Sequence, residues 1–306
     1  MRLAARLGFP YSAPSTPGGV EPVAAPKRTG VDYHSAWARR FPARWSRVVL
    51  LESVMRPAMR VLANPDRVGL DRLADLAARK QPVIFAANHN SHIDTPLVLT
   101  LLPEPWRHHT FVGAAADYFF RTRMTGAVAS LTLNAVPIER TKVSRRSAHH
   151  AAALIDEGWS MLIFPEGGRS PDGWGQPFRG GAAYLSLRCG VPVVPVHIGG
   201  SGRVLAKGKR APARAATTVT FGAPLVPGGD EDSRRFGARL ERAVAALADE
   251  AATDWYSARL RAHHGTTPVL GGPATTSWRR AWARGDHRRP RGSARRRSGP
   301  TWPDLT

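Results

Sequence analysis

Short apolar segments alternate with candidate helices over residues 65–262 of the chain. Apolar runs bounded by polar residues predict buried strands, and they lie at residues 83–87, 110–112, 135–138, 161–164, 191–198 and 217–221. Candidate helices lie at residues 70–79, 96–102, 144–156 and 181–188, and a last helix is predicted to begin near Ser233. This alternation predicts a single α/β domain with a largely parallel, mixed sheet flanked by helices.

The two ends of the chain lack this alternation. Residues 1–30 are rich in proline, alanine, serine and glycine without a period, and this composition predicts a disordered N-terminus. Glycine, proline, threonine and arginine dominate the other end, so residues 263–306 are predicted to form a disordered, Arg-rich tail. Residues 278–297 alone hold nine arginines against one acidic residue, Asp286.

Residues 31–64 form an amphipathic segment in which aromatic and aliphatic residues are interleaved with arginines. Pro42 and Pro57 are expected to divide it into separate helical pieces. Helices of this composition either lie in the interface of a lipid bilayer or pack on a domain with their basic face in solvent. The sequence leaves both interpretations open.

Composition limits the kinds of partner that the protein can bind and the ways in which it can contact a membrane. The net charge of +21 indicates attraction to an anionic partner, such as a nucleic acid or an anionic lipid surface. Cys189 is the only cysteine, so no internal disulfide can form, and its apolar setting predicts a small buried side chain. No segment approaches the roughly 18 apolar residues of a membrane-spanning helix, and residues 1–10 lack the apolar core of a secretory signal. Contact with a bilayer is therefore expected from one side only.

Polar clusters end or follow three of the predicted strands. Residues 88–94 have the sequence NHNSHID, residues 134–140 have NAVPIER, and residues 164–170 have FPEGGRS. Ligands of α/β sheets bind beyond the carboxyl ends of the strands, so these clusters form the candidate site. His89 could remove a proton from a hydroxyl group if Asp94 fixed its tautomer and stabilised its protonated form.

The second and third clusters contain groups suited to binding an anion. Arg140 and Arg169 carry planar guanidinium groups, which suit bidentate binding of phosphate. Gly167 and Gly168 allow backbone N–H groups to approach the same anion closely. The carboxylate of Glu166 suits a substrate hydroxyl group, or the placement of an arginine, better than it suits a phosphate.

These clusters carry a resemblance to a known family. NHNSHID, NAVPIER and FPEGGRS resemble three sequence blocks of the glycerolipid acyltransferases, and VPVVPV at residues 191–196 resembles the fourth. The blocks occur in the family's order, over about residues 65–225, and look most like those of the 1-acylglycerol-3-phosphate acyltransferases. The family commonly has threonine where Gly168 stands and glycine near the position of Asn134, which leaves the identity of the acceptor open.

The resemblance implies an acyltransferase domain over residues 65–262. Its reaction would move a fatty acyl group from acyl-CoA, or from an acyl carrier protein, to the free hydroxyl of a lysophospholipid. The implied acceptor is 1-acylglycerol-3-phosphate, giving phosphatidate by direct transfer without a bound cofactor or metal. By match of position, His89 would be the general base and Asp94 its orienting partner. The residues matched to substrate binding are Arg140, Glu166, Gly167, Gly168 and Arg169. The implied location is peripheral, on an anionic membrane surface at the cytoplasmic face of the cell membrane.

Three alternatives stay open at this point. An acyltransferase of the same family could act on another lysolipid or on a glycolipid. A metal-dependent hydrolase could use His89, His92 and Asp94 as ligands, but the arginines would then have no role. A nucleic-acid-binding protein would explain the arginines and tryptophans of the tail, but no nucleic-acid-binding module is visible, and nucleic acid is not the expected partner.

Overall fold

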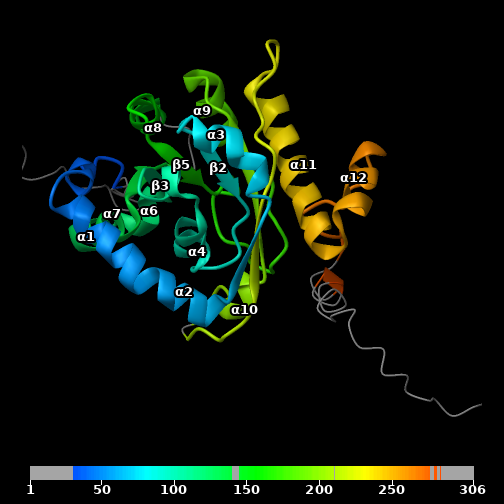
Figure 1. Ribbon diagram of the computed structural model, residues 1–306, viewed down its shortest axis with the longest axis horizontal. Helices are drawn as coiled ribbons and strands as arrows, with labels where there is room; N and C mark the ends of the chain where they lie inside the picture. Colours follow the sequence, from blue (N-terminus) through cyan, green and yellow to red (C-terminus); the bar gives the residue numbers. More distant parts are fainter. Residues whose placement is uncertain (1–29, 140–144, 210, 276–278, 281–282, 284–306) are drawn as a thin grey trace, which may run out of the picture.

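The computed structural model describes residues 30–139, 145–209, 211–275, 279, 280 and 283. A seven-stranded sheet lies between layers of helices (Figure 1). Its order is β1-β7-β6-β2-β5-β3-β4, and all neighbours are parallel except the antiparallel pair β6 and β7. The largely parallel, mixed α/β sheet predicted from the sequence is confirmed. The strands are β1 (Pro65–Val68), β2 (Ile84–Ala87), β3 (Thr110–Ala115), β4 (Ala135–Ile138), β5 (Ser160–Ile163), β6 (Val193–Gly199) and β7 (Thr217–Phe221).

The core lies on both faces of the central strand β2. Phe85 and Ala87 point into one apolar cluster, whereas Ile84 and Ala86 point into another, as expected for side chains that alternate along a strand. The first cluster is covered by α2 (Arg56–Ala63), α3 (Ala74–Ala78) and α4 (Asp94–Leu101). The second is covered by α8 (Arg145–Asp156), α9 (Gly181–Cys189) and α11 (Ser233–Ala252). Because β2 is buried on both sides, the loop at its carboxyl end starts from a rigid point.

The other helical elements are short or peripheral. They are η2 (Ala36–Arg39), α1 (Ala43–Leu50), η3 (Leu51–Met55), η4 (Asp71–Leu73), α5 (Glu104–Arg107), α6 (Ala116–Phe119), α7 (Arg123–Leu133), α10 (Ser201–Val204) and α12 (Trp255–His263).

The predicted helix break at Pro57 is wrong, although Pro42 does separate η2 from α1. α1, η3 and α2 follow one another without interruption. The element between them, η3, is a π-turn in which the N–H of Arg56 donates to the carbonyl of Leu51. In a regular α-helix, Pro57 would lack its hydrogen bond and its ring would clash with the carbonyl four residues earlier. The wider π-turn accommodates the proline, so the helix continues.

The prediction of disorder from residue 263 onward is wrong for residues 264–275, 279 and 280. Leu270, Gly272 and Arg280 of this stretch contact the loop after β5; for example, the N–H of Gly175 donates to the carbonyl of Leu270 at 2.9 Å. A polar, glycine-rich composition misled the prediction, because the contacts are with a distant segment and not within the tail itself. Residues 1–29 and the rest of the predicted tail, apart from residues 263 and 283, lie outside the described residues.

Candidate active site

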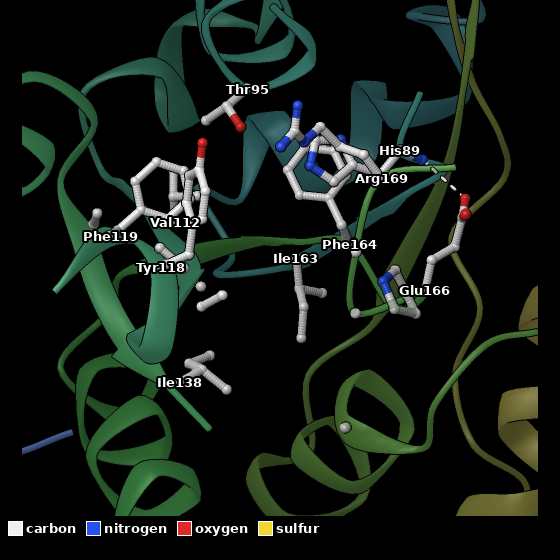
Figure 2. A pocket seen from close by; sticks show the side chains of 18 of the residues that line it. His89, Thr95, Val112, Tyr118, Phe119, Ile138, Ile163, Phe164, Glu166 and Arg169 are labelled. Carbon is white, nitrogen blue, oxygen red and sulfur yellow. Dashed lines mark hydrogen bonds between the residues drawn. The ribbon is translucent and has the colours of Figure 1, made fainter. Parts of the chain in front are cut away.

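A pocket of about 870 Å³ opens at the carboxyl ends of β3, β4 and β5, beside the loop that follows β2. Figure 2 shows that its two ends differ: His89, Glu166 and Arg169 lie at one end, and Val112, Phe119 and Ile138 lie at the other. The candidate site residues from two of the three polar clusters therefore lie around one pocket, with an apolar chamber beside them.

The histidine at the polar end is held by an extension of the sheet. Asn88 is buried directly before it, and its side-chain amide pairs with the backbone of Ile198 on β6. The amide donates to the Ile198 carbonyl at 3.1 Å and accepts from the Ile198 N–H at 2.7 Å. The side chain of Asn88 thus makes the two hydrogen bonds to β6 that backbone groups would make in a continued strand. These bonds fix the position of the backbone at His89.

His89 and Asp94 form a hydrogen-bonded pair. Nδ1 of His89 lies 2.9 Å from Oδ2 of Asp94, whose side chain is fully buried at the start of α4. The same oxygen accepts the backbone N–H groups of Asn90 and Ser91, both at 2.7 Å. An acceptor so placed holds the proton on Nδ1 and leaves Nε2 as the basic nitrogen. The ring of His89 also stacks on Phe164, with centroids 4.1 Å apart, so its orientation is fixed from two sides.

Glu166 joins the loop after β5 to the loop after β2. Its Oε1 accepts the backbone N–H of His89 at 2.8 Å, drawn in Figure 2, and its Oε2 accepts the N–H of Gln176 at 3.0 Å. Burial raises the pKa of Glu166 to about 7, against the opposing effect of these two hydrogen bonds. Both oxygens therefore serve the backbone of the site, and the predicted contact of Glu166 with a substrate hydroxyl stays a prediction.

Arg169 faces the polar end from the same loop. Its guanidinium group contacts Nε2 of His92 and lies over the ring of Tyr118, 5.8 Å from the centroid. Burial and the nearby charges of Arg169 and His89 lower the pKa of His92, which keeps its imidazole neutral and able to accept a hydrogen bond from Arg169. The arrangement keeps Arg169 at the pocket wall.

The two glycines of this loop also line the pocket. Gly167 has a φ of +71°, which favours glycine, and its N–H donates to the carbonyl of Phe164 at 3.0 Å. A Cβ atom on Gly167 would lie 2.8 Å from Nε of Arg179, so the glycine also makes room for that side chain. Gly168 lines the pocket beside it, and its predicted contact with an anion stays a prediction.

Lys207 and Gln176 were not identified from the sequence, yet both line the polar end together with Arg179. Lys207 follows α10, and no local motif marks it. Arg140 lies outside the described residues, so its predicted role as a phosphate ligand stays a prediction; the residue before it, Glu139, lines the pocket.

The three side chains proposed above as metal ligands do not converge on one point, although His89 and Asp94 contact each other. His92 turns to Arg169, whereas Asp94 turns to His89. Across the described residues, no three His, Cys, Asp or Glu side chains converge as metal ligands would. Cys189 packs at the edge of the core on α9, burial raises the pKa of its thiol, and it is not among the pocket residues.

Comparison with known proteins agrees with this geometry. Residues 69–199 match the family model described as Acyltransferase. The chain is 28% identical over 144 residues to the chloroplastic 1-acyl-sn-glycerol-3-phosphate acyltransferase BAT2 of Brassica napus, covering 46% of this chain and 40% of that protein. It is 32% identical over 157 residues to a 1-acyl-sn-glycerol-3-phosphate acyltransferase of Chlamydomonas reinhardtii, covering 50% and 45%. The chain thus spans less than half the length of these curated relatives.

A solved structure shares the fold. The crystal structure of the 1-acyl-sn-glycerophosphate (LPA) acyltransferase PlsC from Thermotoga maritima matches with a TM-score of 0.52 and 21% identity. The match covers 73% of this chain and 85% of that one, and at this identity it speaks for the fold alone. The sequence blocks, the family model over residues 69–199 and the fold all indicate similarity to acyltransferases.

Proposed function

We propose that this protein transfers a fatty acyl group from an acyl thioester, acyl-CoA or acyl carrier protein, to the free hydroxyl of 1-acylglycerol-3-phosphate, giving phosphatidate. The observation that carries the proposal is the position of His89, paired with the buried Asp94, in a pocket with a cationic end and an apolar end. A substrate with a charged head and a hydroxyl group can be bound at the first end while an acyl chain occupies the second. The relatives named above are 1-acyl-sn-glycerol-3-phosphate acyltransferases, which supports this choice of acceptor.

In the proposed reaction His89 is the general base. Its Nε2 takes the hydroxyl proton while the oxygen forms a bond to the carbonyl carbon of the thioester, and Asp94 stabilises the imidazolium. The carbon–sulfur bond then breaks, and the departing sulfur takes the proton back, which leaves His89 neutral and releases the thiol. General-base assistance of this kind typically contributes about 10²–10⁴-fold to a rate.

Substrate binding follows the two ends of the pocket. Arg169, Arg179 and Lys207 line the polar end, and a phosphate bound there would be paired with their charges. The acyl chain of the donor is assigned to the chamber lined by Val112, Ile138 and their neighbours. A volume of about 870 Å³ lies within the roughly 300–1,000 Å³ of pockets that enclose small-molecule ligands.

We further propose that the protein acts at a membrane surface, which it contacts through α1 and α7. Phe41, Trp45 and Val49 at the α1 end of the molecule and Met124 and Val128 on α7 are large apolar side chains exposed to solvent. α1 packs on α7 (Figure 1), and exposed apolar patches of this kind mark interaction sites. In the described part of the chain, no helix has both the length and the apolar character needed to span a bilayer. A location at the cytoplasmic face stays a prediction.

The test uses the purified full chain with labelled lysolipids and both kinds of thioester. Lysophosphatidate is expected to be the preferred acceptor, and His89→Ala is expected to lower transfer by at least about 100-fold without changing the unfolding temperature. His149→Ala is the matched control, because His149 is exposed on α8 and is not a pocket residue. Transfer that survives in the His89 variant would overturn the mechanism, and preference for another lysolipid would overturn the acceptor.

A further inference from the structure

The part of the chain predicted to be a free tail docks beside the active site. We call residues 264–275, 279 and 280 the C-terminal strap. Its Leu270 accepts the N–H of Gly175 at 2.9 Å, and a Cβ atom on Gly175 would lie 2.8 Å from the Leu270 side chain. A Cβ atom on Gly272 would lie 2.3 Å from the ring of Trp174. Each of these glycines allows an approach that any larger residue would prevent.

An ion pair and an indole hydrogen bond complete the contact. Nε of Arg280 donates to Oδ2 of Asp172 at 2.8 Å, and Nη1 of Arg280 donates to the carbonyl of Pro273 within the strap at 3.0 Å. Nε1 of Trp174 donates to the carbonyl of Arg280 at 3.0 Å. Partial burial alone would raise the pKa of Asp172, but the hydrogen bond and charge of Arg280 lower it below its usual range. This guanidinium group is therefore engaged with the protein itself.

The loop held by the strap is the one that holds the catalytic histidine. Residues 172, 174 and 175 meet the strap, Ser170 and Gln176 of the same loop bond to residues of the site, and Gly173 bonds to Ser170. The N–H of Ser170 donates to the carbonyl of His89 at 2.9 Å, and the N–H of Gly173 donates to Oγ of Ser170 at 2.5 Å. Gln176 donates its N–H to Glu166 at 3.0 Å and its side-chain amide to the carbonyl of Arg169 at 3.2 Å.

We propose that the C-terminal strap is a positioning element of the active site, which fixes the loop at residues 170–176 and, through it, His89, Glu166 and Arg169. The inference rests on the proposed function for its activity readout. Without the strap, the loop would sample additional conformations, and the fraction of molecules with an aligned site would fall. The strap then acts through alignment and not through attraction of its charges to lipid.

A double-mutant cycle tests the pair that joins strap and loop. Arg280→Gln and Asp172→Asn are each expected to lower kcat by about tenfold, with little change in KM, and the double variant should lose no more than either single one. Arg280→Lys keeps the charge and should restore part of the loss. Arg234→Gln is the control, because Arg234 is exposed on α11, away from the pocket. Additive losses, or unchanged kcat in both single variants, would overturn the proposal.

Truncated chains distinguish a strap that aligns the active site from a strap that binds lipid through its charges. A chain that ends after residue 263 is expected to lose kcat even with substrate dispersed in neutral detergent, whereas a chain that ends after residue 283 keeps it. A loss seen only with anionic vesicles, or suppressed by salt, would assign the strap to lipid binding instead. Hydrogen exchange at the amides of residues 173–176 provides a readout independent of activity. If these amides stay protected from exchange in Arg280→Gln, the positioning role of the strap is refuted, whether or not acyl transfer is observed.

Discussion

Glu166 allows a quantitative test of how the site is built. Burial raises its pKa from an ordinary 4.5 to about 7, so the folded protein holds a proton there that the unfolded chain has released. Such a group contributes stability that is fully present below about pH 4.5 and is lost as the pH rises through about 7. At 1.36 kcal/mol per pKa unit, the whole effect is about 3 kcal/mol, most of it lost between about pH 5 and about pH 8.5.

The assay is urea unfolding of the wild type and Glu166→Gln at a series of pH values. The difference between the two cancels the titration of all other groups. A glutamine presents one oxygen and one NH₂ group to the two N–H donors of His89 and Gln176, so at about pH 5 the variant should be less stable by about 1–3 kcal/mol. On going to about pH 8.5 the stability difference should shift by about 2–3 kcal/mol in favour of the variant, because only the wild type loses stability through ionisation.

Two outcomes would refute this reasoning. A gap that is constant across the pH range would mean that the pKa of Glu166 is the same in the folded and the unfolded protein. A gap that widens with pH would mean that the two backbone hydrogen bonds outweigh burial, so that the pKa of Glu166 lies below its ordinary value and not above it.

Three further predictions concern catalysis, substrate and membrane. Asp94→Asn should lower kcat, measured by steady-state kinetics, by about 100-fold, because a neutral amide stabilises the imidazolium less than a carboxylate does. If the amide oxygen keeps the place of Oδ2, the NH₂ group takes the buried place of Oδ1, which has no hydrogen-bond partner among the described residues. Arg169→Ala should raise KM for 1-acylglycerol-3-phosphate by roughly 10- to 100-fold, measured against an acceptor without phosphate as control. Trp45→Ser should weaken sedimentation with anionic vesicles yet leave the unfolding temperature unchanged, because the side chain is 64% exposed.

Each of the three has a contradicting result. Unchanged kcat in the Asp94 variant would remove the orienting role of the carboxylate. An equal loss with and without an acceptor phosphate would show that Arg169 shapes the loop and does not bind the anion. Unaltered vesicle sedimentation after the Trp45 substitution would move the membrane contact away from α1.

The central fold was predictable because the buried strands are short apolar runs. β2, β4 and β7 match the predicted segments to within one residue. β1 was missed, since Pro65–Val68 contains Asp66 and Arg67 and lies at the sheet edge, where strands need not be apolar. α7 was missed as well, because no helix was predicted between the candidates at residues 96–102 and 144–156. Its N-terminus carries a capping box between Thr122 and Thr125, a signal that could have located it.

The site was predictable to the extent that its residues are close in sequence. His89 and Asp94 lie within one loop and at the start of the next helix, and Arg169 lies on the loop of the adjacent strand. The contact of Asp172 with Arg280 joins residues 108 positions apart, and no local pattern reports it. The same holds for Lys207. Contacts between distant segments depend on how the whole chain packs, which periodicity and motifs do not encode.

The hydrogen bonds accepted by one carboxylate oxygen of Asp94, Oδ2, explain why four residues separate Asp94 from His89. That atom receives the imidazole and two main-chain N–H groups of the intervening turn at once, while its own residue opens α4. An inserted or deleted residue between positions 89 and 94 would leave some of these donors without their acceptor and would rotate the helix start by about 100°. The spacing between the two residues is thus fixed by the geometry of this turn, so a change in the position of either residue in the sequence would break the arrangement.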